Sequence, residues 1–343
     1  MRRVRARAPL RISFAGGGTD IPSFLDKHSG AVLNVAIDLF AYCSVEATDE
    51  AYCVVECADI GKRAVFNSAI EISSAEFGRL HLASLKYIER LAQLSADNLG
   101  LKITTFCEAP PGSGLGSSST LTVAILKALA TYFEIDLAES DLVDSAYFVE
   151  REMCGFKGGV QDHYSASYGG FNFIELNGVY DGLVQNVSLC SSTILELESL
   201  VFLYSLNISR DSGAIIESQS SQIEAASDVV VDSMKAMQKN AYDSYNALKK
   251  SDLDRFFVEV EKGWEFKKMT SRKISSGLID EVHSTAMNSG AIAGKVSGAG
   301  GGGHMWFLVP IEKRVALKVA LDKFGGEYKQ VKFCPTGSVA WFF

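Results

Sequence analysis

The sequence contains no long hydrophobic run. Its longest apolar stretches, residues 200–206 and 305–309, fall well short of the roughly 20 residues that a membrane-spanning helix requires. The first fourteen residues hold five arginines and no apolar core ahead of a cleavage site, so we expect no export signal there. These absences predict a globular protein that does not enter membranes and works in the cytoplasm.

Cysteine and histidine are sparse and lack the spacings typical of bound metal. The seven cysteines are odd in number, scattered and without a CxxC pair, which favours reduced thiols over a disulfide framework. Cys53 and Cys57 lie four residues apart, but their segment is typical of a strand and has no nearby histidine to complete a zinc site. The five histidines show no HExxH or similar spacing, and we interpret His163 as a neighbour of Asp162 that binds no metal.

Positive charge is also in deficit, because the formal net charge is −8 over 343 residues. The arginines near the N-terminus would suit a nucleic-acid arm, but no larger basic cluster follows them. We therefore expect them on the solvent face of an alternating strand, and we expect no nucleic-acid partner. With 47% hydrophobic residues, the chain can bury a substantial core and is long enough for two domains.

The residue pattern predicts mainly strands in the first hundred residues and mixed elements after them. Strand patterns cover residues 4–14, 31–46, 51–58, 63–66, 101–107, 200–206, 303–309, 329–334 and 337–342. Helical patterns cover residues 73–94, 120–133, 140–154 with Ser140 as a cap, 213–239, 242–250, 253–269, 277–289 and 312–324. The glycine-rich residues 156–176 are expected to form a loop that leads to a strand. Because strands and helices do not alternate regularly, we expect an α+β fold. A polar stretch at residues 177–192 suggests a boundary between domains 1–185 and 186–343.

The most informative stretch is residues 108–124, EAPPGSGLGSSSTLTVA. Two prolines disfavour helix before it, alternate glycines permit a tight turn and close approach to a ligand, and serines can cap the helix that follows. A helix start offers unpaired N–H groups and a partial positive charge, so the stretch indicates a phosphate site. A capped turn that binds nothing is the alternative, although one serine would satisfy it. The Walker pattern GxxxxGK[ST] is absent, which excludes an ordinary P-loop.

A second glycine cluster near the C-terminus matches a misleading pattern. Gly298, Gly300 and Gly303 satisfy GxGxxG, but this dinucleotide motif must follow a strand and open a helix. Here the glycines precede a strand, so we reject the dinucleotide interpretation. We expect instead a loop whose backbone approaches the substrate and phosphates closely.

Three segments, in order, resemble the motifs of the GHMP kinases, a family named for galacto-, homoserine, mevalonate and phosphomevalonate kinases. They are APLRISFAGGGTDIPSF at residues 8–24, the serine-rich stretch, and KVSGAGGGG at residues 295–303, so the resemblance covers nearly the whole chain. AGGGTD and GGVQDHYSASYGG, at residues 158–170, most resemble the D-glycero-D-manno-heptose 7-phosphate kinase branch. The resemblance implies a two-domain fold, with an N-terminal mixed sheet with helices and a C-terminal ferredoxin-like α+β domain. It also implies ATP and Mg²⁺ as cofactors and a small sugar phosphate as substrate.

The resemblance also implies site residues. Asp162 matches the base that accepts the proton of the sugar hydroxyl, with Arg11 beside it, and Glu150 and Ser118 match the Mg²⁺ ligands. Glu152 competes with Glu150 and Ser117 with Ser118 for these roles. The implied nucleotide-binding residues are Pro111, Gly112, Gly114, Leu115, Gly116, Ser117, Ser118 and Ser119. The implied substrate-binding residues are Gly18, Thr19, Asp20, Arg210, Gly300 and Gly301.

Several alternatives stay open at this point. Asp162 would also suit a turn cap, and Arg210 an exposed helix start rather than a distal phosphate site. Galactokinases carry Glu and His where this chain has Gly17 and Gly18, which puts galactose in doubt. The expected acceptor is the anomeric hydroxyl of heptose 7-phosphate; another sugar such as fucose, or a catalytically silent nucleotide- or sugar-binding relative, are the alternatives. The sequence indicates neither the oligomeric state nor the adenine-binding residues.

Overall fold

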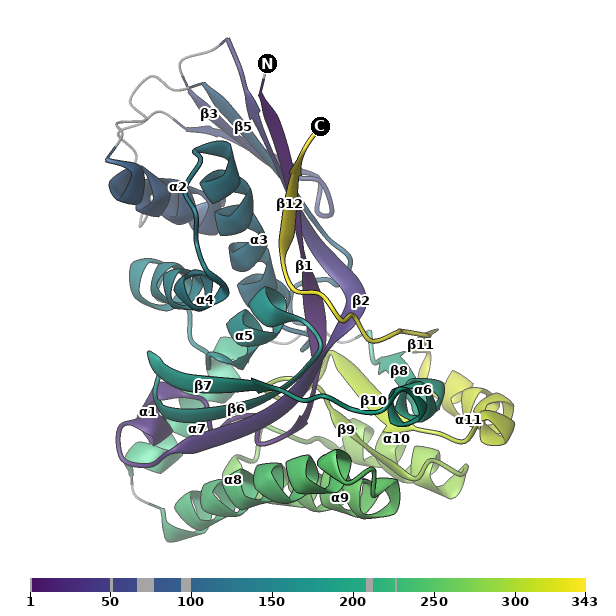
Figure 1. Cartoon of the computed structure of the whole chain (residues 1–343). Coiled ribbons are helices and arrows are strands. Elements are labelled where there is room, and N and C mark those ends of the chain that lie inside the picture. Colours follow the sequence, from purple (N-terminus) through teal and green to yellow (C-terminus); the bar gives the residue numbers. More distant parts are fainter. Residues whose placement is uncertain (1, 50–51, 67–76, 94–99, 208–211, 226) are drawn as a thin grey trace.

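A computed structural model describes residues 2–49, 52–66, 77–93, 100–207, 212–225 and 227–343. Within these residues the chain forms two sheets with helices packed around them (Figure 1). One hydrophobic core runs through both sheets, since it contains Leu10 of the first and Leu203 and Trp306 of the second. Phe14 joins the two parts, with its ring 5.3 Å from Phe256 and 5.4 Å from Trp306. None of the described helices is both long and apolar enough to cross a bilayer.

The first sheet has the order β12-β1-β2-β5-β3-β4, with β6 and β7 joined to β2. Its strands are β1 (Arg3–Ala15), β2 (Gly30–Ala47), β3 (Cys53–Cys57), β4 (Lys62–Phe66), β5 (Leu101–Cys107), β6 (Phe171–Gly178), β7 (Asp181–Asn186) and β12 (Val339–Phe342). The long strand β2 pairs with β6 along its first third and with β5 along its last third. The pairing of β1 with β2 shifts register between Pro9 and Arg11, and such a bulge bends a strand and re-aims the side chain beside it.

The N-terminal arginines lie where the alternating pattern places them. Arg3, Arg5 and Arg7 alternate with buried residues along β1, so the prediction of a solvent face is confirmed. The guanidinium of Arg5 lies 4.1 Å above the ring of Phe343, because the last strand returns to pair with β1. Figure 1 shows the two chain ends close together along these strands.

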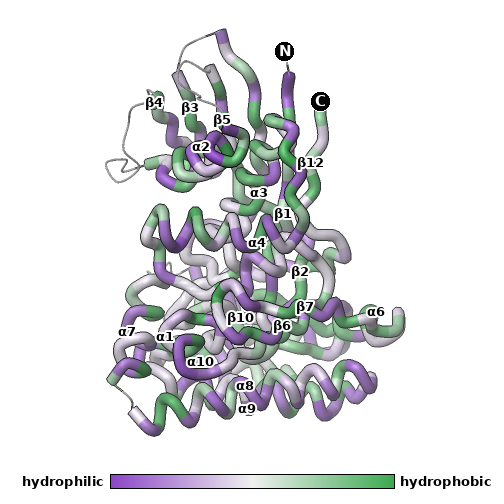
Figure 2. The backbone as a smooth tube through the Cα atoms, turned by 60° about the vertical axis from the view of Figure 1, so that its left-hand side comes forward, coloured by the Kyte–Doolittle hydropathy of each residue, from purple (hydrophilic) through white to green (hydrophobic). Residues whose placement is uncertain are grey.

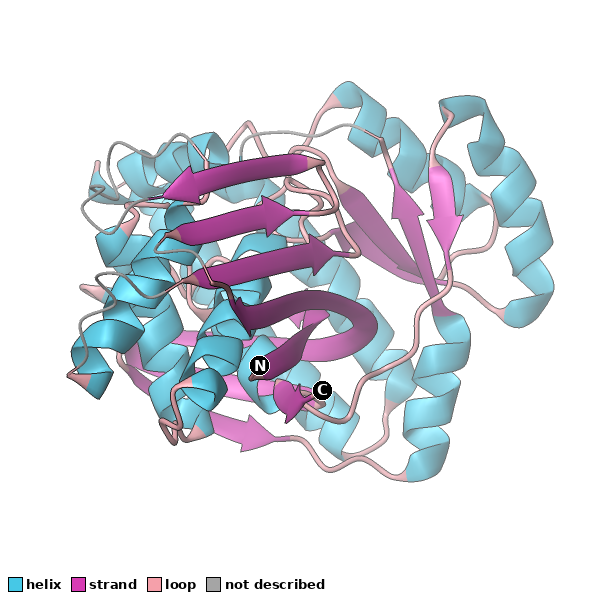
Figure 3. Cartoon of the chain, turned by 90° about the horizontal axis from the view of Figure 1, so that it is seen from above, coloured by secondary structure: helices cyan, strands magenta, loops and turns pink. Residues whose placement is uncertain are grey.

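The second sheet has the order β11-β8-β10-β9, and all its pairs are antiparallel. Its strands are β8 (Val201–Ser205), β9 (Ala293–Val296), β10 (His304–Leu308) and β11 (Glu327–Lys329). Numbered along the chain, this order is 4-1-3-2, with helices between the first and second and between the third and fourth strands. That is the ferredoxin-like βαββαβ arrangement, so the predicted α+β fold class is confirmed. Figure 3 shows the two sheets side by side with helices around them.

The helices cover both sheets. They are α1 (Pro22–Leu25), α2 (Arg79–Ala92), α3 (Ser117–Tyr132), α4 (Glu139–Tyr147), α5 (Gln161–Tyr168), α6 (Ser191–Leu200), α7 (Ser212–Glu224), α8 (Asp228–Lys249), α9 (Leu253–Thr270), α10 (Gly277–Asn288) and α11 (Arg314–Leu321). Short 3-10 turns at Ile311–Lys313 and Asp322–Phe324 flank α11, and a π-helix at Phe148–Met153 continues α4. The apolar helix α3 packs across β1 and β2. Hydrophobic and hydrophilic stretches alternate along α8 and α9, which pack against each other (Figure 2).

Several predicted elements were wrong. The expected loop at residues 156–176 contains α5, and α8 runs unbroken through the predicted gap at residues 240–241, because the Asn240 amide donates to Glu259 on α9 instead of ending the helix. The predicted strand at residues 329–334 ends at Lys329, after which only Phe333 forms a bridge, to Ile37. Ala138, not Ser140, is the N-cap residue of α4. No sequence pattern predicted α6, β7 or β9. The division at residue 185 stays a prediction.

Candidate active site

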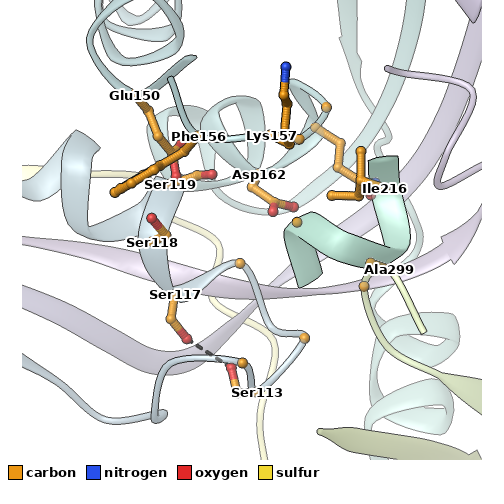
Figure 4. A pocket seen from close by; sticks show the side chains of 18 of the residues that line it. Ser113, Ser117, Ser118, Ser119, Glu150, Phe156, Lys157, Asp162, Ile216 and Ala299 are labelled. Atoms are coloured by element: carbon orange, nitrogen blue, oxygen red, sulfur yellow. Dashed lines mark hydrogen bonds between the residues drawn. The ribbon is translucent and has the colours of Figure 1, made fainter. Parts of the chain in front are cut away.

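A cavity of about 730 Å³ lies where the serine-rich loop, the N-terminal glycine turn and the start of α5 meet α7 and α9. Figure 4 shows Asp162 and the three serines around one space, with Glu150 next to Ser119. Most of the residues expected in the site line this cavity. They are Arg11, Gly18, Asp20, Pro111, Gly112, Gly114, Gly116, Ser117, Ser118, Ser119, Glu150 and Asp162.

The serine-rich loop ends in an uncapped helix start. Gly112, Gly114 and Gly116 have φ angles of 77°, 77° and 83°, which residues with a side chain rarely adopt. Gly116 is the N-cap residue of α3, so the helix begins at Ser117, three residues earlier than predicted. No side chain caps it, which leaves the N–H groups of its first turn for an anion. Ser117 is tied into the loop instead, with its hydroxyl oxygen 2.8 Å from that of Ser113.

The buried Arg11 and the partly exposed Asp162 form an ion pair beside this helix start. Arg11 Nε and Nη2 both lie 2.6 Å from Asp162 Oδ1, and Arg11 Nη1 donates to the carbonyl oxygen of Gly114 at 2.6 Å. A methyl group added to Gly116 would lie 3.0 Å from the carboxyl carbon of Asp162. The carboxylate therefore touches the end of the loop. Both contacts with Arg11 use Oδ1, and among the described residues none hydrogen-bonds to Oδ2, so this oxygen stays available to a hydroxyl group in the cavity.

Glu150 lies on the π-helix, in a turn type that often marks functional sites. Its side chain is 1% exposed, and its Oε2 lies 2.8 Å from His163 Nε2 and 3.3 Å from Arg151 Nη2. Burial raises the pKa of Glu150, but Arg151, His163 and a hydrogen bond from Ser118 outweigh it and lower the pKa to about 2. The carboxylate is thus held ionised next to the Ser118 hydroxyl.

The structure distinguishes Glu150 from Glu152 and shows which residue His163 contacts. Glu152 is exposed and accepts a hydrogen bond from the Tyr180 hydroxyl, away from the serines. His163, which follows Asp162 in the chain, lies with its Nε2 2.8 Å from Glu150 Oε2, a contact that the sequence did not indicate. The sequence does not show these contacts, because α5 brings His163 to the π-helix only in the folded chain.

Asp20 lines the cavity beside the start of α5. Its oxygens accept hydrogen bonds from the backbone N–H of Gly18 at 2.9 Å, and from the backbone N–H and amide of Gln161 at 3.1 and 3.3 Å. A carboxylate can accept about four hydrogen bonds, so one position remains for a ligand hydroxyl. Asp20 therefore holds the start of α5 in place and still reaches the cavity.

Four residues expected in the site do not line the cavity. Leu115 and Thr19 are fully buried, and the Thr19 hydroxyl donates to backbone oxygens of Gly16 and Ala31. Gly301 donates to the Ile274 carbonyl oxygen at 2.7 Å, and Gly300 packs against the same residue. In this loop Gly298 and Ala299 reach the cavity instead. Arg210 lies outside the described residues.

Other lining residues were missed from the sequence. Lys267 and Gln219 come from α9 and α7, where their neighbours are polar too, so no sequence signal marks them. Leu80, Leu121 and Phe156 add apolar side chains to the lining of the cavity, which suits a flat heterocycle. The cavity thus combines an anion-binding helix start, hard oxygen ligands and a poised carboxylate, the parts that phosphoryl transfer requires.

Comparison with known proteins supports this chemistry. The models of the GHMP kinases N terminal domain and GHMP kinases C terminal match residues 80–170 and 244–326. The chain is 33% identical to D-glycero-alpha-D-manno-heptose 7-phosphate kinase of Campylobacter jejuni, over 99% of each chain. It is similar to the crystal structure of a D-glycero-D-manno-heptose 1-phosphate kinase from Bacteroides thetaiotaomicron, with a TM-score of 0.81 and 30% identity over 98% of each chain. A galactokinase from Lactococcus lactis shares the fold, with a TM-score of 0.77 at 16% identity over 98% of this chain and 95% of its own.

Proposed function

We propose that this chain, which belongs to the GHMP kinase family and is an ATP-dependent sugar kinase, phosphorylates the anomeric hydroxyl of D-glycero-D-manno-heptose 7-phosphate. The product is the 1,7-bisphosphate. The observation that carries this choice of acceptor is the similarity, over almost the whole of both chains, to a kinase named for that sugar phosphate. The free thiols of all seven cysteines and the need for ATP support a cytoplasmic location.

We infer the direction of ATP in the cavity from the residues that line it. Its phosphates meet the first turn of α3, where N–H groups and the helix dipole favour negative charge. Its adenine then lies along the apolar side chains of Leu80, Leu121 and Phe156. In this direction the terminal phosphate would lie next to Asp162.

The donors beside the serines suit Mg²⁺, which prefers oxygen ligands and keeps several waters. The ionised Glu150 and the Ser118 hydroxyl would hold the ion together with phosphate oxygens. When bound, Mg²⁺ neutralises phosphate charge during transfer. Arg151 and His163 keep the Glu150 carboxylate fixed and ionised for this role.

Asp162 is the proposed general base. Arg11 grips Oδ1 and also holds the Gly114 carbonyl, so the guanidinium fixes the carboxylate relative to the phosphate loop. The second carboxylate oxygen accepts the proton of the anomeric hydroxyl while the hydroxyl oxygen attacks the terminal phosphorus. Positioning of this kind accounts for most of the rate in phosphoryl transfer.

The acceptor end offers space where bulkier side chains would intrude. A methyl group on Gly17 would lie 2.8 Å from Ser13 Oγ, and one on Gly18 would lie 3.2 Å from the Gln219 amide nitrogen. Gly17, Gly18 and Asp20 all line the cavity, so at the two glycines the acceptor meets backbone and no side chain. Asp20 would accept one of its hydroxyl groups.

An ADP-release assay tests the acceptor. The purified chain is given ATP and Mg²⁺ with heptose 7-phosphate, a different sugar 7-phosphate, unphosphorylated heptose, fucose or galactose. We expect the largest kcat/KM with heptose 7-phosphate. Turnover of free sugars alone would exclude this acceptor and favour another sugar kinase, and binding of ATP without any transfer would indicate a catalytically silent relative.

A further inference from the structure

Lys267 on α9 is a buried cation at the wall of the cavity. The residue is 4% exposed, yet it lines the cavity. Its Nζ donates to the carbonyl oxygen of Gly17 at 3.2 Å and to that of Gly298 at 2.5 Å. It therefore joins the N-terminal glycine turn to the C-terminal glycine loop.

The charge of Lys267 is balanced differently from the charges of the two arginines that line the same cavity. Burying a cation is costly unless it is paired, and the two arginines of the cavity each have a carboxylate, the buried Arg11 with Asp162 and the partly buried Arg151 with Glu150. Among the described residues no carboxylate oxygen lies within ion-pair distance of Lys267 Nζ. An ammonium group has three N–H donors, and the two carbonyl oxygens take two of them.

Lys267 nevertheless stays largely charged near neutral pH. Burial lowers its pKa to about 8, while Asp20 raises it, Arg11 lowers it and Asp162 raises it. All three residues line the cavity, and Asp162 is the proposed base. An uncompensated positive charge is thus kept at this place, where it can meet an anion.

The phosphate loop contacts Gly298, the residue whose carbonyl oxygen Lys267 holds. A methyl group on Gly298, whose oxygen the lysine holds, would lie 2.6 Å from the carbonyl oxygen of Gly114. The same Gly114 oxygen accepts a hydrogen bond from Arg11, the partner of Asp162. Lys267 therefore lies close to the phosphate loop and to the arginine that holds Asp162.

We propose that Lys267 is a further catalytic residue whose third N–H donates to an oxygen of the phosphoryl group during transfer. The inference rests on the proposed function. In the step, a bond forms between the acceptor oxygen and the terminal phosphorus, and the bond from that phosphorus to the bridging oxygen of ATP breaks. The hydroxyl proton goes to Asp162 and ADP leaves with the electron pair. Negative charge spreads over the phosphoryl oxygens in this step, so a fixed cation stabilises it there.

Lys295 on β9 provides a matched control. It is also a buried lysine, 3% exposed, and its Nζ donates to the carbonyl oxygen of Phe14 at 3.0 Å. It does not line the cavity. Replacing either lysine by methionine removes a buried amino group and its hydrogen bond to a carbonyl oxygen, but only Lys267 lines the cavity.

The test compares Lys267→Met and Lys295→Met in steady-state kinetics with ATP and heptose 7-phosphate, and measures nucleotide binding by calorimetry. We expect Lys267→Met to lower kcat by about 100-fold with the Kd for ATP changed less than about threefold, and Lys295→Met to leave kcat within about threefold. Lys267→Arg, which keeps the charge, should recover part of the rate. If Lys267→Met does not fold, Lys267→Gln serves in its place.

Three results would overturn or redirect the inference. Equal kcat losses in the two methionine variants would reduce Lys267 to a structural role. A rise in KM for heptose 7-phosphate alone, with turnover of unphosphorylated heptose unchanged, would place the lysine on the acceptor's own phosphate instead. Absence of transfer by the wild-type chain would contradict the proposed function itself, which separates that failure from a failure of Lys267.

Discussion

Replacing Gly114 by alanine tests whether the two glycine loops must touch for the site to work. Gly114 has a φ of 77°, and an added methyl group would lie 2.5 Å from the Ser297 carbonyl oxygen. Gly325 has a similar φ of 66°, but a methyl group there meets no atom within 4 Å. Gly325→Ala therefore reproduces the backbone strain without the collision.

The structure gives the size of both effects. The left-handed backbone costs an alanine about 1 kcal/mol, so both variants should lose about that much stability. Ordinary contact begins at 3.4 Å, so in Gly114→Ala the loops must separate by about 1 Å. Gly114 also holds Arg11, and a displacement of this size at a reacting group lowers the rate about 100-fold, or about 3 kcal/mol.

Urea unfolding and kinetics with ATP and the sugar acceptor measure these effects together. We expect kcat/KM to fall about 100-fold in Gly114→Ala and to stay within about twofold of wild type in Gly325→Ala. A Gly114→Ala enzyme with wild-type kinetics would refute the requirement that the loops touch. Equal losses in both variants would show that general destabilisation, not the contact, is responsible.

Three further predictions concern single side chains. Asp162→Asn should lower kcat about 1000-fold and leave ATP binding intact. Steady-state kinetics measure the loss of rate, and a nucleotide titration measures the Kd for ATP. Burial lowers the pKa of Lys267 to about 8, so as the pH rises the native state loses this proton before the unfolded chain does. The free energy of unfolding of the wild type, compared with that of Lys267→Met, should therefore rise by about 2 kcal/mol from about pH 7 to about pH 9.5. Urea titrations at both pH values check this, and a constant or falling difference contradicts it. Hydrogen bonds, first that of Ser192, lower the pKa of the exposed Cys190 to about 6, so iodoacetamide should alkylate Cys190 first without loss of activity, as peptide mass spectrometry would reveal.

Local sequence features predicted the parts of the site that are local in structure. Alternate glycines followed by serines indicated a helix start that binds anions, and the structure begins α3 at Ser117 without a cap. The alternating arginines of β1 followed the period of a strand. In both cases the residues that decide the structure are neighbours in the chain.

Distant contacts decided what the sequence did not show. The backbone N–H of Gln161 at the start of α5 donates to Asp20, 141 residues away, so a helix begins inside a glycine-rich stretch that was expected to be a loop. Asp162 meets Arg11 across 151 residues, and only the resemblance to a family suggested that they belong together. Burial of Lys267 depends on the glycine loops that meet above α9, which no pattern within the helix could indicate.

The most direct test of the account is phosphorus NMR of the product formed from ATP, Mg²⁺ and heptose 7-phosphate. The account predicts one new phosphate signal coupled to the anomeric proton, with the 7-phosphate signal retained and one ADP formed for each sugar. Release of inorganic phosphate without that signal, or a new phosphate on any other carbon, would contradict it.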